Sequence, residues 1–418
     1  MSRYAKDKRD LPHPRPVQKI ELSGEHTLRR FIAAGLFLLI GGAALAYAAL
    51  QMMTPDTGWQ AIQASASGGP TCGEEFVFLY ELGAGGLSVS AENKAVRLIY
   101  TEACRKAYQL FHTTEGFEGV VNLYELSRRP NEVLEVDKAL YDAFDAVREA
   151  GDRTVYLGPV YARYGDLFYC RDDAQLVDFD PRLSEAVAEE YAAVAAYAAD
   201  PGHIDVELLG ENKLCLRVSE EYLAYAGREG IECFLDFGWM KNAFITDYLA
   251  EALAEGGFSH GAISSFDGFS RCLDGRSGSY SMNLYGRQQS EPVHVGVMEY
   301  QGPMSLVSLR AFPVDVSDDR RFYQTRDGQF RTQYLDLADG VCRNAVDSMV
   351  CYASGRSCAQ LAMEAGPLFI ADSFREDLAE ELAKGDIQLV WCRDQDVRAT
   401  DPELNVKELR QGYTLTKP

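Results

Sequence analysis

Acidic, basic and glycine residues gather in two short stretches that follow apolar runs. The stretch FLDFGWMKNAF supplies Asp236 and Gly238 just before a predicted helix, and AISSFDGFSR supplies Asp267, Gly268 and Arg271. An acid and a glycine gain nothing from packing in a buried strand, whereas the free amides at a helix start can bind a phosphate group. We therefore expect the two strand ends to lie side by side in a sheet and to hold an anionic ligand together.

The same residues also have structural explanations. Asp236 can cap a helix, Gly238 can serve a turn, and Asp267 with Gly268 can form a loop. In the helix that follows Asp236, an apolar stripe is expected to face the core, with Asp247 and Glu251 on the opposite side. Both readings stay open at this point.

Other familiar site patterns are missing from the sequence. The histidines show no HExxH or HxH spacing, and no GxSxG motif occurs near a strand end. The glycine-rich run 83–86 is followed by Leu87, Ser88 and Val89, which we interpret as a strand, so we expect a hairpin turn there and not a phosphate loop.

The elements that position the two stretches alternate between helices and strands without a strict βαβ period. Strands are expected near 75–80, 213–218, 260–264, 293–299, 305–309, 348–352 and 387–391, and the first stretch is expected to begin as a strand. Helix starts are expected at Asp137, at Asp180 before Pro181, and at a capping box from Ser373 to Glu376. The pattern predicts a mixed α+β domain.

An uncharged run of twenty residues, FIAAGLFLLIGGAALAYAAL, occupies positions 31–50. A helix of that length spans the roughly 30 Å apolar layer of a bilayer. Eight Lys or Arg residues and four acids precede it. The positive-inside rule then predicts a single-pass membrane protein with its N-terminus inside and everything after Leu50 outside the cytoplasm. Cleavage as a signal peptide is the alternative, although the nearest small-residue site, Ala64-Ser65-Ala66, lies far downstream.

These features predict a cytoplasmic tail at 1–30, an anchor at 31–50, a linker at 51–71, a domain at 72–395 and a C-terminal tail at 396–418. Of the 41 basic and 63 acidic residues of the chain, the first thirty positions hold eight and four, which leaves 33 and 59 and a net charge of −26 after them. Such a surface repels phosphate backbones, so we expect no nucleic-acid partner.

Ten cysteines follow the apolar run. An even number in an exported segment favours disulfides, while buried thiols are the alternative. The absence of any CxxC motif argues against a structural zinc site.

The two stretches resemble the signature region of ApbE-type flavin transferases, the FAD:protein FMN transferase family, whose pattern runs near LDLGGIAKGYAVD, a helix, and ALVNAGGDIR. The matching positions are Leu235, Asp236, Gly238, Asp247, Gly268 and Arg271. Downstream, QYLDLADG at 333–340 is similar to HILDPRTG, and the helix start at 359–365 is similar to ADALATA. Order and spacing agree from about residue 75 to residue 385.

The resemblance implies an ApbE-like fold and a family chemistry. Members bind FAD with magnesium, cleave the pyrophosphate and attach FMN through a phosphoester to a Thr or Ser of an extracytoplasmic flavoprotein. Carried over by position, the implied catalytic acids are Asp267 and Asp336, and the implied metal ligands are Gln360 and Glu364. The implied flavin-binding residues are Asp236, Gly238, Lys241, Gly268 and Arg271.

Several family positions are occupied by other residue types. Gln360 and Glu364 stand where the family has Asp and Thr, Gln333 stands for its His, and Lys241 precedes the position of the family lysine, which is Asn242. Trp239 replaces a Gly and is expected to fill space beside the ligand. Two functions follow: a divergent, magnesium-dependent transferase, or a catalytically inactive flavin-binding or protein-interaction descendant.

Overall fold

The computed structural model describes Gly41, residues 56–276, 279–288 and 291–315, Asp318, and residues 320–418. The predicted tail and anchor lie outside the described residues, apart from Gly41. Among the residues that the structure describes, no helix is both long and apolar enough to cross a membrane. The account below concerns the unit formed by residues 56–418.

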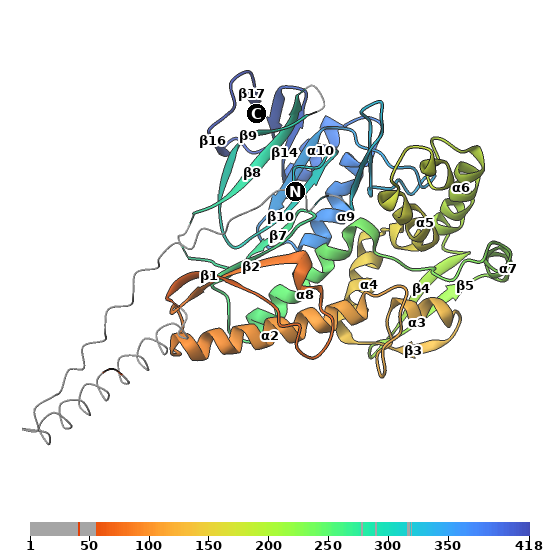
Figure 1. Ribbon diagram of the computed structural model, residues 1–418, viewed down its shortest axis with the longest axis horizontal. Coiled ribbons are helices and arrows are strands. Elements are labelled where there is room, and N and C mark those ends of the chain that lie inside the picture. The colour runs from red at the N-terminus through yellow and green to blue at the C-terminus, as the bar shows by residue number, and fades with distance from the viewer. Residues whose placement is uncertain (1–40, 42–55, 277–278, 289–290, 316–317, 319) are drawn as a thin grey trace, which may run out of the picture. The chain divides into compact units, whose positions relative to one another are not determined.

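A nine-stranded sheet in the order β1-β2-β6-β7-β10-β13-β14-β15-β17 organises this unit (Figure 1). Neighbouring strands are antiparallel except β15 and β17, which are parallel. The strands are β1 Gly58–Ile62, β2 Phe76–Leu82, β6 Gly261–Ser265, β7 Phe269–Cys272, β10 Met304–Arg310, β13 Ser348–Ala353, β14 Gln388–Arg393, β15 Asp396–Ala399 and β17 Thr414–Thr416.

Four helices pack against one face of the sheet and enclose the larger hydrophobic core. They are α2 Val89–Leu110, α8 Lys241–Glu255, α9 Cys358–Phe369 and α10 Glu376–Lys384. Phe78 of β2, for example, meets Tyr100 of α2 with ring centroids 5.0 Å apart. Alternate residues of each strand point to opposite faces, so one side of β2 is buried under α2.

The second face of the sheet is covered only in part. A three-stranded sheet, β16-β9-β8, covers β10, β13 and β14 and encloses a smaller core that includes Leu306 and Val350. Its strands are β8 Ser279–Gln288, β9 Glu291–Gln301 and β16 Asn405–Lys407. Over β1 and β2 the same face carries the exposed side chains of Trp59, Val77 and Leu79.

The remaining elements lie between α2 and α8 in the chain and in a hairpin before β13. The small sheet β3-β5-β4 comprises β3 Val133–Glu135, β4 Ile204–Gly210 and β5 Lys213–Val218, and the hairpin pairs β11 Phe322–Gln324 with β12 Phe330–Thr332. The helices are α3 Leu123–Arg128, α4 Lys138–Ala150, α5 Gly158–Tyr164, α6 Glu185–Ala199 and α7 Glu220–Glu229.

The expected mixed α+β class and seven expected strands are confirmed, but the glycine run 83–86 was misread. Ser88 caps α2 by accepting a hydrogen bond from Ala91 N, so a helix follows where a strand was expected. The loop amide of Gly83 donates to the buried carboxylate of Glu92 at 2.7 Å. An internal carboxylate therefore accepts the hydrogen bond of this loop amide.

Two expected helix starts were also wrong. Helix α6 begins after Ser184 and not at Asp180, because the Asp180 carboxylate instead accepts a 2.6 Å hydrogen bond from Arg331 Nε. Helix α10 begins after Arg375 without a side-chain cap, so the expected capping box from Ser373 does not form. Asp137 caps α4 as expected.

The expected linker and C-terminal tail both contribute strands. β1 lies within 51–71 and pairs with β2, and β15, β16 and β17 lie within 396–418. All ten cysteines are free thiols, eight of them buried, so the expected disulfides do not form and the alternative of buried thiols holds.

Candidate functional site

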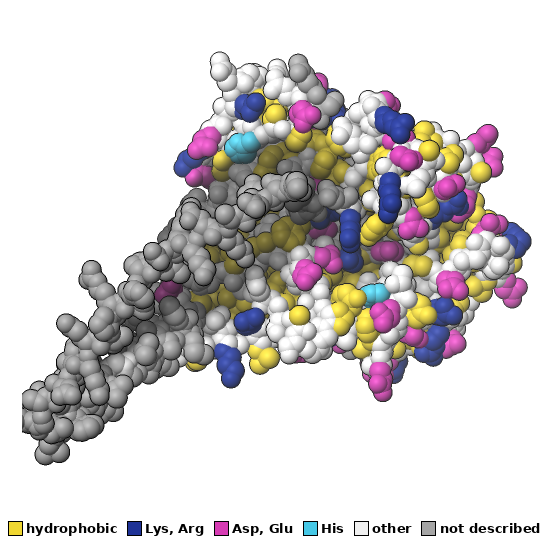
Figure 2. Space-filling view, viewed as in Figure 1, with side chains coloured by type: hydrophobic (Ala, Val, Ile, Leu, Met, Phe, Trp, Pro, Cys, Tyr) yellow, Lys and Arg dark blue, Asp and Glu magenta, His cyan; other side chains and the backbone are white. Residues whose placement is uncertain are grey.

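A cavity of about 420 Å³ opens in front of the first turn of α8. Aromatic side chains from the end of α2 and from α5 and the segment after it form much of its wall, namely Tyr108, Phe111, Tyr161, Tyr164, Phe168 and Tyr169. Its polar lining includes Glu75, Asp236, Lys241, Arg320 and Gln333. On the face of the molecule shown in Figure 2, acidic and basic side chains are interspersed. The cavity lining also holds both acids and bases, so what sets the cavity apart is its aromatic wall.

The segment before α8 is extended but is not a strand, contrary to expectation. Its amides bond to side chains and loops instead of a sheet neighbour: Ser127 Oγ accepts from Phe234 N at 3.1 Å and from Leu235 N at 3.3 Å. Asp236 N donates to Val155 O at 2.9 Å. These bonds fix the chain direction as it enters the cavity wall.

Asp236 and Gly238 form the turn that leads into α8. Asp236 Oδ1 accepts a 2.8 Å hydrogen bond from Gly238 N. Gly238 has a φ of 53°, and a Cβ at this position would lie 2.2 Å from Cζ of Tyr161. A glycine is therefore required both for the left-handed backbone and for the close approach of Tyr161.

Polar side chains of the first turn of α8 join the two predicted turns. Asn242 Nδ2 donates to Glu75 Oε2 at 3.0 Å and to Asp267 Oδ2 at 2.9 Å. Lys241 Nζ lies 3.5 Å from Glu75 Oε2. The structure thus brings Asp236, Lys241 and Asp267 into one cluster, as the sequence predicted, with Glu75 and Asn242 as additional members.

The electrostatics of this cluster are set by burial and by mutual attraction. Burial raises the pKa of Asp236, while the Gly238 amide and the Lys241 ammonium act in the opposite direction. Burial likewise raises the pKa of Asp267. For Lys241, burial lowers the pKa, but Glu75, Asp236 and Asp267 outweigh it and hold the pKa above its ordinary value. Lys241 is therefore a stable cation at neutral pH.

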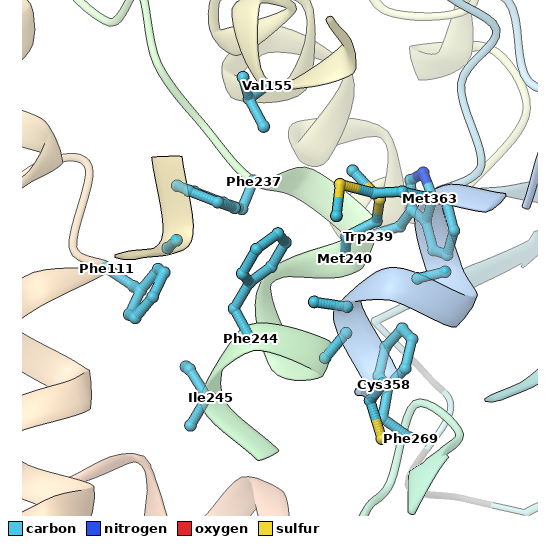
Figure 3. Packing of buried hydrophobic residues seen from close by; sticks show 14 of the residues in the cluster. Phe111, Val155, Phe237, Trp239, Met240, Phe244, Ile245, Phe269, Cys358 and Met363 are labelled. Atoms are coloured by element: carbon cyan, nitrogen blue, oxygen red, sulfur yellow. The ribbon is translucent and has the colours of Figure 1, made fainter. Parts of the chain in front are cut away.

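Trp239 closes the space between α8 and α9 (Figure 3). Its side chain is 3% exposed, and its ring meets Phe269 at 6.3 Å and Tyr334 at 5.6 Å between centroids. A Cβ on Gly366 of α9 would lie 2.8 Å from the Trp239 ring. The indole thus fills the place between the cavity and α9.

The predicted metal ligands lie on α9 and make other contacts. Gln360 Oε1 accepts a 3.0 Å hydrogen bond from Ser357 N within a capping box. Glu364 Oε1 accepts a 2.9 Å hydrogen bond from Arg356 Nη1. Neither residue lines the cavity. Within the described part of the chain, no group of three or more His, Cys, Asp or Glu side chains could hold a metal ion. Gln360 is a neutral amide held in its own capping box and Glu364 pairs with Arg356, so these two residues do not fit a magnesium site.

Four further predicted residues lie outside the lining of the cavity, and Asp267, bonded to Asn242 as described above, is one of them. Arg271 Nη1 lies 2.8 Å from Asp247 Oδ1, and Asp247 is buried instead of facing solvent. Gly268 has a φ of 108° and turns so tightly that a Cβ would lie 2.1 Å from Ser308 O. Asp336 Oδ1 accepts from Ala338 N at 2.9 Å in a turn. The structure gives each of these residues a role in the fold.

Sequence reasoning missed much of the cavity. Glu75 was included in a strand, and no local pattern marked the aromatic residues from Tyr161 to Tyr169 as a wall. Their spacing is that of an ordinary amphipathic segment. Asn242 was noticed only because it stands where the related pattern has a lysine.

Comparisons with known proteins find similarity at the level of structure. No family model matches the sequence, and no curated protein matches it. The flavin transferase ApbE from Vibrio cholerae superimposes with a TM-score of 0.54 and 13% identity, covering 84% of this chain and 98% of that one. A mutant of the same enzyme gives a TM-score of 0.52 and 13% identity, covering 84% and 97%.

Coverage of nearly the whole ApbE chain means that the likeness extends beyond one motif. At 13% identity it establishes the fold alone. The resemblance inferred from the sequence is therefore confirmed at the level of the fold: the chain has an ApbE-like fold.

Proposed function

We propose that the cavity in front of α8 binds a flavin nucleotide and that the chain acts as a flavin-binding protein without magnesium-dependent transfer. The observation that carries this is the position of Lys241, a half-buried cation on the first turn of a helix, at a cavity with aromatic walls. Aromatic rings stack on a planar isoalloxazine, and a cation at a helix start attracts a phosphate. The ApbE-like fold supports the choice of ligand.

Magnesium does not enter this proposal. Mg²⁺ needs hard oxygen ligands, commonly carboxylates, arranged around one point. Gln360 and Glu364 satisfy their own helix and Arg356 instead, and Trp239 stands between α9 and the cavity. In the cluster beside the cavity, the Lys241 ammonium lies among Glu75, Asp236 and Asp267 and offsets part of their charge.

The proposal keeps the location that the sequence predicts. The apolar run 31–50 would anchor the chain in the cell membrane, with the ApbE-like domain outside the cytoplasm. FAD or FMN would then be held at the outer surface of the membrane, where an extracytoplasmic flavoprotein is the partner of matching chemistry. The acidic surface favours a protein partner over nucleic acid.

A flavin titration tests the proposal. FAD and FMN are added to the full chain in detergent, with magnesium or with EDTA, and flavin fluorescence and AMP release are recorded. We expect saturable fluorescence quenching that is equal in both conditions, and no AMP. Glu364→Gln should leave the titration unchanged because Glu364 contacts Arg356. Unchanged flavin fluorescence would disprove binding, while AMP release that depends on magnesium would show an active transferase.

A further inference from the structure

The first three strands of the large sheet expose an apolar surface on the side opposite α2. Trp59 is 47% exposed, Leu79 is 42% exposed and Val77 is 38% exposed. The register places Leu79 of β2 between Ala61 of β1 and Ala262 of β6, so all of these residues share one face. We call this surface, formed by Trp59, Val77, Leu79 and Ala262, the open face.

The open face differs from the rest of the same side of the sheet. Along β10, β13 and β14, the sheet β16-β9-β8 covers that side and buries Leu306 and Val350. Over β1, β2 and β6, the described residues provide no such cover for Trp59 or Leu79. Exposed apolar patches of this kind mark contact sites on soluble domains.

Aromatic and charged groups border the open face. Tyr280 meets Trp59 edge to face, with ring centroids 6.1 Å apart. Both residues line a groove of about 420 Å³ together with Leu79. Arg276 pairs with Asp274 and Glu81 at the rim of this groove, so its positive charge offsets part of the charge of the two acids.

The length of chain before β1 determines what can reach the open face. Trp59 follows the end of the apolar run, Leu50, by nine residues. A fully extended chain covers at most about 3.5 Å per residue, so Trp59 lies within about 30 Å of the end of the predicted span. Trp and Tyr favour the boundary between lipid and water, because their rings are apolar and each carries a polar group.

We propose that the open face rests on the outer leaflet of the membrane, with Trp59 and Tyr280 at the level of the lipid headgroups. This inference depends on the membrane anchor in the proposed function and is independent of flavin binding. A second contact besides the anchor would fix which side of the domain faces the bilayer. In this proposal β1 and β2 therefore orient the domain.

Tryptophan fluorescence of the full chain in phosphatidylcholine vesicles tests the proposal. The chain has three tryptophans, and Trp239 and Trp391 are 3% and 8% exposed, so Trp59 is the one that can meet lipid or solvent. Vesicles with brominated acyl chains quench tryptophan at short range. The emission of Trp59 is the difference between the native chain and the Trp59→Phe variant. We expect the brominated vesicles to reduce this emission. Leu79→Asp should abolish this quenching, and Leu98→Asp, on the exposed side of α2, should leave it intact.

Each outcome decides the question. Flotation of the chain with the vesicles reports the anchor separately from the contact. A chain that floats but whose Trp59 emission is insensitive to bromine and sensitive to iodide overturns the docking proposal and leaves the anchor. Emission protected from both quenchers also overturns it, because another polypeptide segment or a second copy then covers the face. A chain that does not float overturns both the anchor and the docking.

Discussion

Arg271 Nη1 lies 2.8 Å from Asp247 Oδ1, and the same carboxylate accepts hydrogen bonds from the first amides of α9, Cys358 N at 2.9 Å and Ala359 N at 2.8 Å. One buried acid of α8 therefore joins β7 and the start of α9. An anion at a helix N-terminus is also favoured by the helix dipole. Asp247 and Arg271 therefore have a role in the fold, and neither lines the cavity.

Asp247→Asn should lower the free energy of unfolding by about 3 kcal/mol, because breaking a buried ion pair leaves Arg271 without its partner. Burial raises the pKa of Asp247 as it does that of Asp236, but both oxygens of Asp247 accept hydrogen bonds, so an asparagine would turn its NH2 group toward a donor. Denaturant unfolding of the variant measures this loss. The control is Glu132→Gln, which removes an exposed pair with Arg129 and should change stability little. Similar losses in the two variants would contradict the proposed role of the junction.

Gly238→Ala should destabilise the protein far more than Gly257→Ala. Both glycines have positive φ values, 53° and 82°, so both substitutions incur the backbone cost of about 1 kcal/mol. At Gly257 a Cβ meets nothing within 4 Å, whereas at Gly238 it collides with Tyr161. The difference between the two unfolding free energies isolates the collision. Equal values would show that Tyr161 moves aside at no cost.

Asp236→Asn should stabilise the protein at pH 7 and lose that effect as the pH falls. Burial raises the pKa of Asp236 above its ordinary value of 3.8, so the folded state binds the proton more tightly than the unfolded state. The charged form therefore costs stability above the folded pKa, and this cost disappears below the ordinary value. Asparagine retains an oxygen for Gly238 N. Thermal unfolding between pH 7 and pH 4 measures the effect, and a shift that is the same at both ends would contradict this account.

Lys241→Met should weaken flavin binding by about tenfold or more, which corresponds to the loss of one charge-assisted contact of roughly 1.5 kcal/mol. The fold should survive, since the side chain of Glu75 is 43% exposed and can be hydrated. Lys138→Met is the matched control, because Lys138 is an exposed lysine at the start of α4 and does not line the cavity. Flavin dissociation constants that do not differ between the two variants would remove Lys241 from the site.

The strands were predicted well because each contains enough apolar and β-branched residues to be recognised from its own short stretch of sequence. The start of α6 was misplaced because the Asp180 carboxylate pairs with Arg331, 151 residues away, and no local pattern reveals such a partner. The glycine run 83–86 was predicted to be a hairpin turn because the sequence does not show that the Glu92 carboxylate accepts a hydrogen bond from the Gly83 amide.

The candidate site was predicted in part. Asp236, Lys241 and Asp267 converge as expected because β6 packs along α8 and brings Asp267 back to the start of that helix. The expected contribution of Gln360 and Glu364 depended on α9 facing the cavity. A single replacement, Trp239, fills the space between α8 and α9, and its effect follows from three-dimensional packing and not from spacing.

Flavin titration of a variant with a blocked cavity tests the central claim most directly. Gly165 lines the cavity, and a Cβ there meets nothing within 4 Å, so Gly165→Leu should place its side chain in the cavity without disturbing the fold. Gly227→Leu, equally free of neighbours but on α7, is the matched control. We predict that Gly165→Leu abolishes flavin quenching while Gly227→Leu binds as the native chain does. Undiminished binding by Gly165→Leu, with its melting temperature unchanged, would contradict the account.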